Sequence, residues 1–233
     1  MTAGFVVALR AEARSLIKTA VVPRTCVRLP DSSLLRLAGI GPERARDAAD
    51  ALITTGATAL ISWGCAGALQ HSLLPGTLVL PDKILTSDQT GLPVNLSWRE
   101  RLSQRLRQQV HIAAGTLIES PYVVSSPAEK TALFKRSGAL AVDMESAAIA
   151  RVAAAAERPF LAVRAVSDSA SMTLPFFGAT DAFGRVRLFQ LLTSLMHRPH
   201  LLPSLIRAGL AFRVAQNTLA KVARLGGPRL LAP

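Results

Sequence analysis

Three acidic residues lie where buried strands are predicted to end. Glu145 follows a short apolar run, Asp168 follows the partly β-branched run 160–166, and Glu12 follows the apolar run 4–9. Carboxylates beside apolar segments are costly unless they bind a ligand or pair with a cation. Open α/β sheets bind ligands at the carboxyl ends of their strands, so Glu145 and Asp168 form a candidate site for acid–base chemistry.

A purely structural role remains open for each of these acids. Asp143 is a good N-cap for the helix that follows it, and Glu145 would then be an ordinary first-turn acid favoured by the helix dipole. Asp168 could cap a following turn, with Arg164 as its ion-pair partner. Glu12 could be a surface residue at a helix start.

The elements that must position these acids form a β-α-β unit. Residues 139–142 and 160–166 are predicted strands, and residues 144–156 are nearly all strong helix formers. A right-handed crossover would bring Glu145 and Asp168 close together. Further strands are predicted over 4–9, 34–38, 58–63, 77–80 and 112–118, and further helices over 42–55, 97–109 and 126–137.

The fold class predicted from this order is α/β. We expect a single domain over residues 1–184, with a central mixed, largely parallel sheet flanked by helices, and a basic helical tail over 185–233. The stretch 51–81 lacks acidic and basic residues, but its glycines and prolines favour a buried strand–turn–strand over a membrane span. Residues 169–184 are predicted to form an apolar lid.

Four segments, in order, resemble the nucleoside phosphorylase superfamily. They are residues 6–12, 63–69, 142–147 and 163–168, and the resemblance extends over roughly residues 4–170. That superfamily includes the purine and uridine phosphorylases and the nucleosidases that remove adenine from methylthioadenosine and S-adenosylhomocysteine. The resemblance implies cleavage of a ribosyl–purine bond on a fold of this kind.

The resemblance also implies roles for individual residues. A protonated Asp168 would act as general acid toward purine N7, an ionised Glu145 would accept hydrogen bonds from the ribose hydroxyls, and Glu12 would activate water. Further substrate-binding positions implied by the matching segments are Met144, Ser167, Arg164, Gly64, Cys65, Ala66, Gly67 and Val123. The small residues Gly64–Gly67 follow the predicted strand 58–63, and we expect them to form a loop whose backbone approaches a ligand closely, or else a tight turn. Cys65 stands where the nucleosidases usually have serine, and Ala68 where a second glycine is common.

The sequence leaves the nucleophile open between water and phosphate. Glu12 favours water, whereas Arg10, Arg44, Arg46 and Arg164 could collect phosphate as a co-substrate. No other cofactor and no metal is expected. The two cysteines lack metal-type spacing, and the four histidines are scattered, with only His197 and His200 at ligand spacing, in an arginine-bearing segment.

The tail carries most of the net charge of +12, and residues 182–233 contain no acid. Within 203–225, Leu205, Phe212 and Leu219 recur every seven residues opposite an arc with Arg213 and Arg224, as in an amphipathic cationic helix. It could pack on the domain or a second subunit, or dock on an anionic membrane. Nucleic acid is disfavoured because base-reading motifs are missing.

The whole chain most resembles the hopanoid-associated phosphorylases, whose inferred substrate is the lipid adenosylhopane. We therefore expect a cytoplasmic homodimer, peripheral on the inner face of the membrane, that releases adenine from this lipid. Two alternatives remain open. One is a soluble methylthioadenosine or S-adenosylhomocysteine nucleosidase whose tail is a dimer helix, and the other is an inactive scaffold that binds membranes or a partner.

Overall fold

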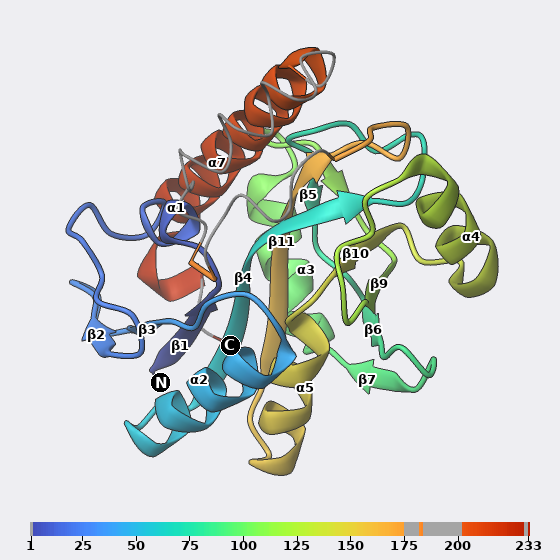
Figure 1. Cartoon of the computed structure of the whole chain (residues 1–233). Coiled ribbons are helices and arrows are strands. Elements are labelled where there is room, and N and C mark those ends of the chain that lie inside the picture. The colour runs from blue at the N-terminus through green and yellow to red at the C-terminus, as the bar shows by residue number, and fades with distance from the viewer. Residues whose placement is uncertain (1, 175–181, 184–201, 231–232) are drawn as a thin grey trace.

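The computed structural model describes residues 2–174, 182–183, 202–230 and 233. The predicted α/β class is confirmed: a mixed, largely parallel sheet is flanked by helices (Figure 1). The predicted lid over 169–184 and the start of the predicted tail, residues 185–201, lie largely outside the described residues.

Within the described residues, eleven strands form one hydrogen-bonded sheet. They are β1 (Ala3–Val7), β2 (Cys26–Arg28), β3 (Leu34–Leu37), β4 (Ala59–Ala68), β5 (Leu78–Val79), β6 (Lys83–Leu85), β7 (Gly91–Pro93), β8 (Ile112–Ala113), β9 (Thr116–Glu119), β10 (Ala141–Asp143) and β11 (Phe160–Asp168). The helices are α1 (Arg10–Ala13), α2 (Pro42–Thr54), α3 (Leu96–Leu106), α4 (Pro127–Ser137), α5 (Ser146–Ala155) and α7 (Leu202–Leu230).

The long strand β4 is the centre of the sheet. It runs parallel to β1 on one side and to β11 on the other, and its last residues, Gly67 and Ala68, pair with β10 in the antiparallel sense. Gly64–Gly67, which was expected to be a loop, instead continues the strand, because both neighbours supply backbone partners there.

The predicted β-α-β order is confirmed, with α5 between β10 and β11, but the predicted parallel relation of the two strands is wrong. Strand β10 pairs in parallel with β9 and antiparallel with the end of β4, whereas β11 pairs with β4 and β5. The two strands therefore meet through β4, and the ends of β10 and β11 come to opposite sides of its last residues.

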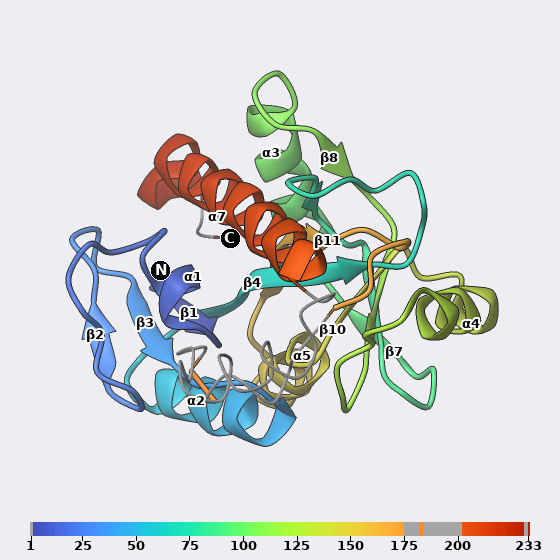
Figure 2. The same cartoon turned by 45° about the horizontal axis from the view of Figure 1, so that its top comes forward.

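Helices cover both faces of the sheet (Figure 2). On one face, α2 packs against α5; on the other, α7 packs against β11, α3 and α1. The α7 side chains Ala215, Leu219 and Val222 are fully buried within the main hydrophobic core. The described part of the tail is thus packed onto the α/β domain.

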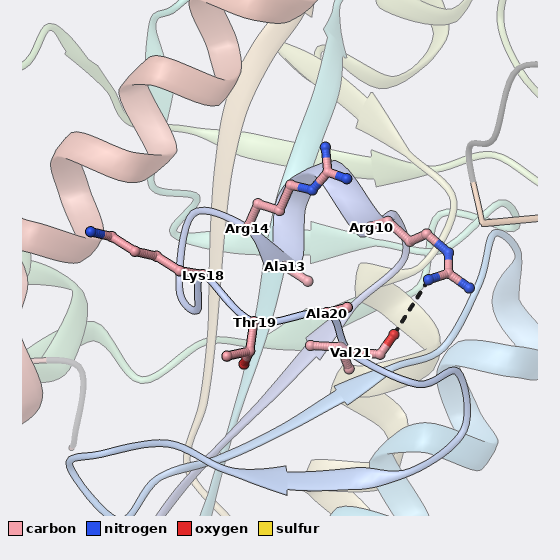
Figure 3. A pocket seen from close by; sticks show the side chains of 7 residues that line it. All are labelled: Arg10, Ala13, Arg14, Lys18, Thr19, Ala20 and Val21. Carbon is pink, nitrogen blue, oxygen red and sulfur yellow. Dashed lines mark hydrogen bonds between the residues drawn. The ribbon is translucent and has the colours of Figure 1, made fainter.

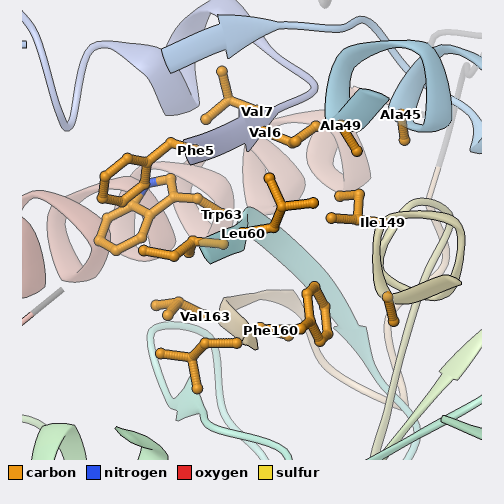
Figure 4. Close-up of a cluster of buried hydrophobic side chains, with 14 of the residues drawn as sticks. Phe5, Val6, Val7, Ala45, Ala49, Leu60, Trp63, Ile149, Phe160 and Val163 are labelled. Atoms are coloured by element: carbon orange, nitrogen blue, oxygen red, sulfur yellow. The ribbon is translucent and has the colours of Figure 1, made fainter. Parts of the chain in front are cut away.

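The core lies where β1, β4 and β11 are covered on both sides. All five residues of β1 are buried, as expected for a strand with helices on both faces. The rings of Phe5 and Trp63 meet edge to face with centroids 5.8 Å apart (Figure 4). Such a rigid core fixes the strand ends that carry the acidic residues.

Helix α4 begins and ends as its sequence predicts. Ser126 and Glu129 form a capping box, Pro127 occupies the first turn, and Gly138 ends the helix in the left-handed conformation with φ 65°. These local signals set the register of α4, and so they set which of its residues face the sheet.

No helix among the described residues is long and apolar enough to cross a membrane. The stretch 51–81 forms the end of α2, strand β4, a turn and strand β5, which agrees with the predicted strand–turn–strand.

Candidate active site

A buried arginine joins two of the acidic residues at the end of the sheet. Arg164, on β11, is 2% exposed, and its Nη2 lies 2.6 Å from Asp143 Oδ2 and 3.9 Å from Glu145 Oε2. Its guanidinium also donates to the hydroxyls of Ser62 and Ser146. Although burial alone disfavours its charge, these acids raise the pKa of Arg164 above its ordinary value.

This arrangement changes the roles foreseen for Asp143 and Arg164. Asp143 accepts from the backbone N–H and the hydroxyl of Ser146 at the start of α5, as a cap would, but it is also the nearest counter-ion of Arg164. The ion-pair partner of Arg164 is therefore not Asp168.

Glu12 is held beside Arg164 by backbone donors. It is 2% exposed, and its Oε2 accepts from the N–H groups of Ala8 and Leu9 at 3.1 and 2.9 Å. Its Oε1 accepts from the N–H of Cys65 on β4 at 2.8 Å. Burial raises the pKa of the Glu12 carboxyl, and Arg164 opposes the rise. A fixed carboxylate whose proton affinity is raised can take a proton from water.

Two glycines of β4 make room for these carboxylates. A Cβ on Gly64 would lie 2.5 Å from both Arg164 Nη1 and Glu12 Oε1, and a Cβ on Gly67 would lie 3.1 Å from Asp168 Oδ2. The small residues thus allow charged side chains from α1 and β11 to approach the β4 backbone, in keeping with the predicted close approach at this segment.

Glu145 lies between β10 and α5, and its Oε1 accepts from the N–H of Gly41 at the start of α2 at 3.0 Å. Burial raises the pKa of Glu145 to about 7; Arg164 opposes this rise and Asp143 adds to it. Near neutral pH this carboxyl can therefore exchange a proton, and its ionised form can accept hydrogen bonds.

Glu145→Gln should remove a pH-dependent loss of stability. An acid whose pKa rises on folding binds more protons when folded, so its stabilising contribution is full below about 4.5 and is lost as the pH rises through about 7. We expect urea unfolding to show that the stability of the variant relative to the wild type increases by about 3 kcal/mol between pH 4.5 and 8. The exposed Glu43→Gln on α2 is the control. Equal pH profiles for wild type and Glu145→Gln would contradict the expectation.

Asp168 ends β11 and is paired with a lysine that sequence reasoning missed. Its Oδ2 lies 2.5 Å from Nζ of Lys130 on α4, and its Oδ1 accepts from the hydroxyl of Ser167 at 2.8 Å. Both partners of the ion pair are buried. The only indication in the sequence is that Lys130 lies on the side of α4 that packs against the core.

Helix α7 also reaches the site. Gln216 donates through Nε2 to Cys65 Sγ at 3.3 Å, and burial raises the pKa of the Cys65 thiol well above its ordinary value. The tail therefore touches the predicted substrate-binding segment, which its amphipathic pattern did not reveal.

The remaining predicted positions are less closely tied to the acids. Ala66 is buried in β4, while Met144 lies next to Glu145 and is half-buried. Val123 is half-buried and Tyr122 is 65% exposed. Within the described part of the chain, ion pairs join Asp143 and Glu145 to Arg164, while Glu12 lies beside Arg164 at Gly64 and Asp168 lies across Gly67.

The four arginines that could collect phosphate have different surroundings. Arg164 is occupied by its buried partners, Arg44 donates to the carbonyl of Ile40, and Arg46 is exposed. Arg10 lines a pocket of about 120 Å³ and donates to the carbonyl of Val21. In that pocket Arg14 and Lys18 point in different directions (Figure 3).

Comparisons with known proteins identify the family and show a shared fold. The profile of the Phosphorylase superfamily matches residues 31–196. A methylthioadenosine/S-adenosylhomocysteine nucleosidase from Neisseria meningitidis superposes with a TM-score of 0.72 at 21% identity, covering 96% of this chain and 97% of that one. Futalosine hydrolase from Helicobacter pylori gives a TM-score of 0.73 at 16% identity, covering 97% and 96%. No curated protein sequence matches the chain.

Proposed function

Since the chain belongs to the phosphorylase superfamily, we propose that it cleaves the N-glycosidic bond of an adenosyl substrate and releases adenine. The observation that carries this proposal is the cluster of buried carboxylates near the carboxyl ends of the central strands β4 and β11. Glu12 and Glu145 flank Arg164, and Asp168 lies across Gly67 of the same strand. Three acids held in this way can serve the nucleophile, the sugar and the leaving base.

Each acid has a role that its surroundings support. Breaking the bond builds positive charge on the sugar and negative charge on the base. Glu12, with its raised pKa, takes the proton of the attacking water. Glu145 accepts hydrogen bonds from the ribose hydroxyls, and its negative charge favours the cationic transition state. Asp168 delivers a proton to N7 of the purine.

We take water as the nucleophile. The four arginines considered for phosphate binding are either bonded elsewhere or exposed, as described above. Beside Arg164 stands the carboxyl group of Glu12, which would repel phosphate when ionised but can accept a proton from water. Phosphate as a co-substrate is the alternative that the assay below distinguishes.

For the substrate we propose a membrane lipid that carries the adenosyl group, namely adenosylhopane. Support comes from the surface of α7, where Leu202, Ile206, Leu210 and Val214 form a stripe at four-residue spacing. These side chains are 46–59% exposed. Arg207 and Arg213 are exposed on the same helix, which carries no acid. An exposed apolar stripe with basic flanks suits an anionic lipid surface.

The stripe is not the face that the heptad spacing predicted. Leu219 and Val222 of that face are buried against the domain, and Leu205 and Phe212 are half-buried. The face predicted from the heptad spacing packs against the domain. We therefore assign membrane contact to the neighbouring exposed stripe.

Ile206→Glu should weaken binding to vesicles that contain phosphatidylglycerol. Burying one such side chain contributes about 1.5–3 kcal/mol, so the partition coefficient should fall about tenfold or more. Co-sedimentation measures it, and Leu96→Glu, at an exposed apolar position on α3, is the matched control. Equal binding by both variants would exclude the α7 stripe as the contact surface.

The function itself is tested by adenine release from an adenosyl-lipid in vesicles and from methylthioadenosine, each with and without phosphate. We expect release from the lipid without phosphate. Release from methylthioadenosine alone would favour the soluble nucleosidase, whose solved relatives have the same fold. Release that requires phosphate would show that phosphate, and not water, is the nucleophile. No release from either compound would overturn the proposal.

A further inference from the structure

Lys130 is the most completely buried charged residue of the described chain, with no exposed surface. Its ammonium group donates to Asp168 Oδ2 at 2.5 Å and to the carbonyl oxygens of Ser169 and Met172 at 2.8 and 3.0 Å. All three of its hydrogens therefore have acceptors. Burying an ammonium group costs desolvation free energy, which its three hydrogen bonds and the charge of Asp168 offset here.

The same contacts define the state of Asp168 before substrate binds. One oxygen faces the Lys130 ammonium and the other accepts from the hydroxyl of Ser167. A carboxyl group with a donor on each oxygen is arranged as a carboxylate, with two lone-pair positions left for a ligand. A carboxylate can accept hydrogen bonds from a purine, but it has no proton to give to the departing base.

Lys130 holds the nearest proton. Asp168 has few other neighbours that could supply one, because Gly67 lies against its Oδ2 and the hydroxyl of Ser167 is a much weaker acid than an ammonium. Solvent reaches Asp168 poorly, since its side chain is 5% exposed. The proton that the leaving base needs is therefore on the Lys130 ammonium, which is hydrogen-bonded to the Asp168 carboxylate.

We propose that Lys130 positions Asp168 and supplies the proton that Asp168 passes to the leaving base. This inference rests on the proposed glycosidic cleavage. Before reaction, Lys130 holds the carboxylate of Asp168 against β4. It also ties Asp168 to the turn that contains Ser169 and Met172.

The proton balance is complete. An N–H bond of Lys130 breaks and an O–H bond forms on Asp168, which turns a buried ion pair into a neutral pair. That O–H bond then breaks while an N–H bond forms on the leaving base, and the electron pair of the glycosidic bond goes to the base. Water adds to the sugar and its proton goes to Glu12. After the products leave, Lys130 regains a proton from solvent and Glu12 loses one.

The test uses a leaving group that needs no proton. A purine methylated at N7 already carries positive charge and departs as a neutral base. The substrate is whichever of methylthioadenosine and the adenosyl-lipid the wild type cleaves, together with its N7-methylated derivative. With the unmethylated substrate, Lys130→Met should lower kcat by about 10²–10⁴-fold, the usual contribution of a positioned acid. With the methylated substrate, kcat of Lys130→Met should stay within about threefold of the wild-type value, because this leaving group needs no proton.

Two further variants complete the test. Lys130→Arg keeps the positive charge beside Asp168, but a guanidinium does not release its proton in proteins, so it should show the same selective loss. It also carries the test if Lys130→Met fails to fold. Lys135→Met, at an exposed position on the same helix, should leave both activities unchanged.

Three results would overturn the inference. Equal loss with both substrates would make Lys130 a structural residue only, and full activity of Lys130→Met on the unmethylated substrate would remove it from the reaction. In both cases the proposed function stands, because the wild type cleaves. If the wild type cleaves neither substrate, the proposed function fails and the inference fails with it.

Discussion

Asp168→Asn should reduce the rate of adenine release by about 10²–10⁴-fold, because asparagine keeps the shape of the side chain but cannot deliver a proton to the base. Substrate affinity should change far less, since the amide retains hydrogen-bonding atoms at the same place. Steady-state kinetics with the substrate that the wild type cleaves would separate the two effects: kcat falls while KM changes little.

The controls for this variant address folding. Asparagine leaves the Lys130 ammonium buried without its counter-ion, so some loss of stability is expected and the circular dichroism of the variant must match the wild type at the assay temperature. Asp47→Asn, at an exposed position on α2, should have full activity. Unchanged adenine release by a folded Asp168→Asn protein would remove Asp168 from the reaction as the general acid.

Arg164→Met should have the largest effect on stability. The substitution removes the cation that Asp143 and Glu145 share and leaves both acids buried. Removing one partner of a buried ion pair costs about 3–5 kcal/mol, which is a large share of the stability of a domain of this size. Urea unfolding near pH 7 measures the loss directly.

The matched control is Arg101→Met on α3, where the arginine is exposed and the change should stay within about 0.5 kcal/mol. Asp143→Asn combined with Arg164→Met should lose less than the sum of the single variants, because the two side chains are in contact. A loss below about 1 kcal/mol for Arg164→Met would mean that the acids do not depend on this cation.

Local signals made much of the fold predictable from the sequence. The capping box of α4, the proline and glycine that bound its ends and the apolar runs of β1, β3 and β11 each act within a few residues of themselves. The acids Glu12, Glu145 and Asp168 could be selected because each follows an apolar run.

The contacts that join the site could not be predicted in the same way. Lys130 pairs with Asp168 across 38 residues, and Gln216 meets Cys65 across 151. No periodicity links such positions, because the pairing depends on how α4 and α7 pack on the sheet. The small residues Gly64–Gly67 suggested a loop, but they continue strand β4 because they pair with β10 and β11. These partners are distant in the sequence, so the local pattern did not reveal them.

The face of α7 shows a further limit of pattern analysis. Its heptad spacing identified a helix with apolar and basic arcs, but spacing alone does not say which surface covers the apolar arc. The domain covers it at Ala215, Leu219 and Val222, and a second stripe with four-residue spacing is exposed. Only the packing distinguishes these two apolar surfaces.

The most direct test of the whole account is the fate of the sugar when the reaction runs in ¹⁸O-labelled water with phosphate present. Mass spectrometry should find adenine together with a free sugar that carries the heavy oxygen at the carbon that held the base. That result would establish glycosidic cleavage with water as the nucleophile. A sugar phosphate without the label would contradict the role of Glu12, and the absence of adenine would contradict the account of the site.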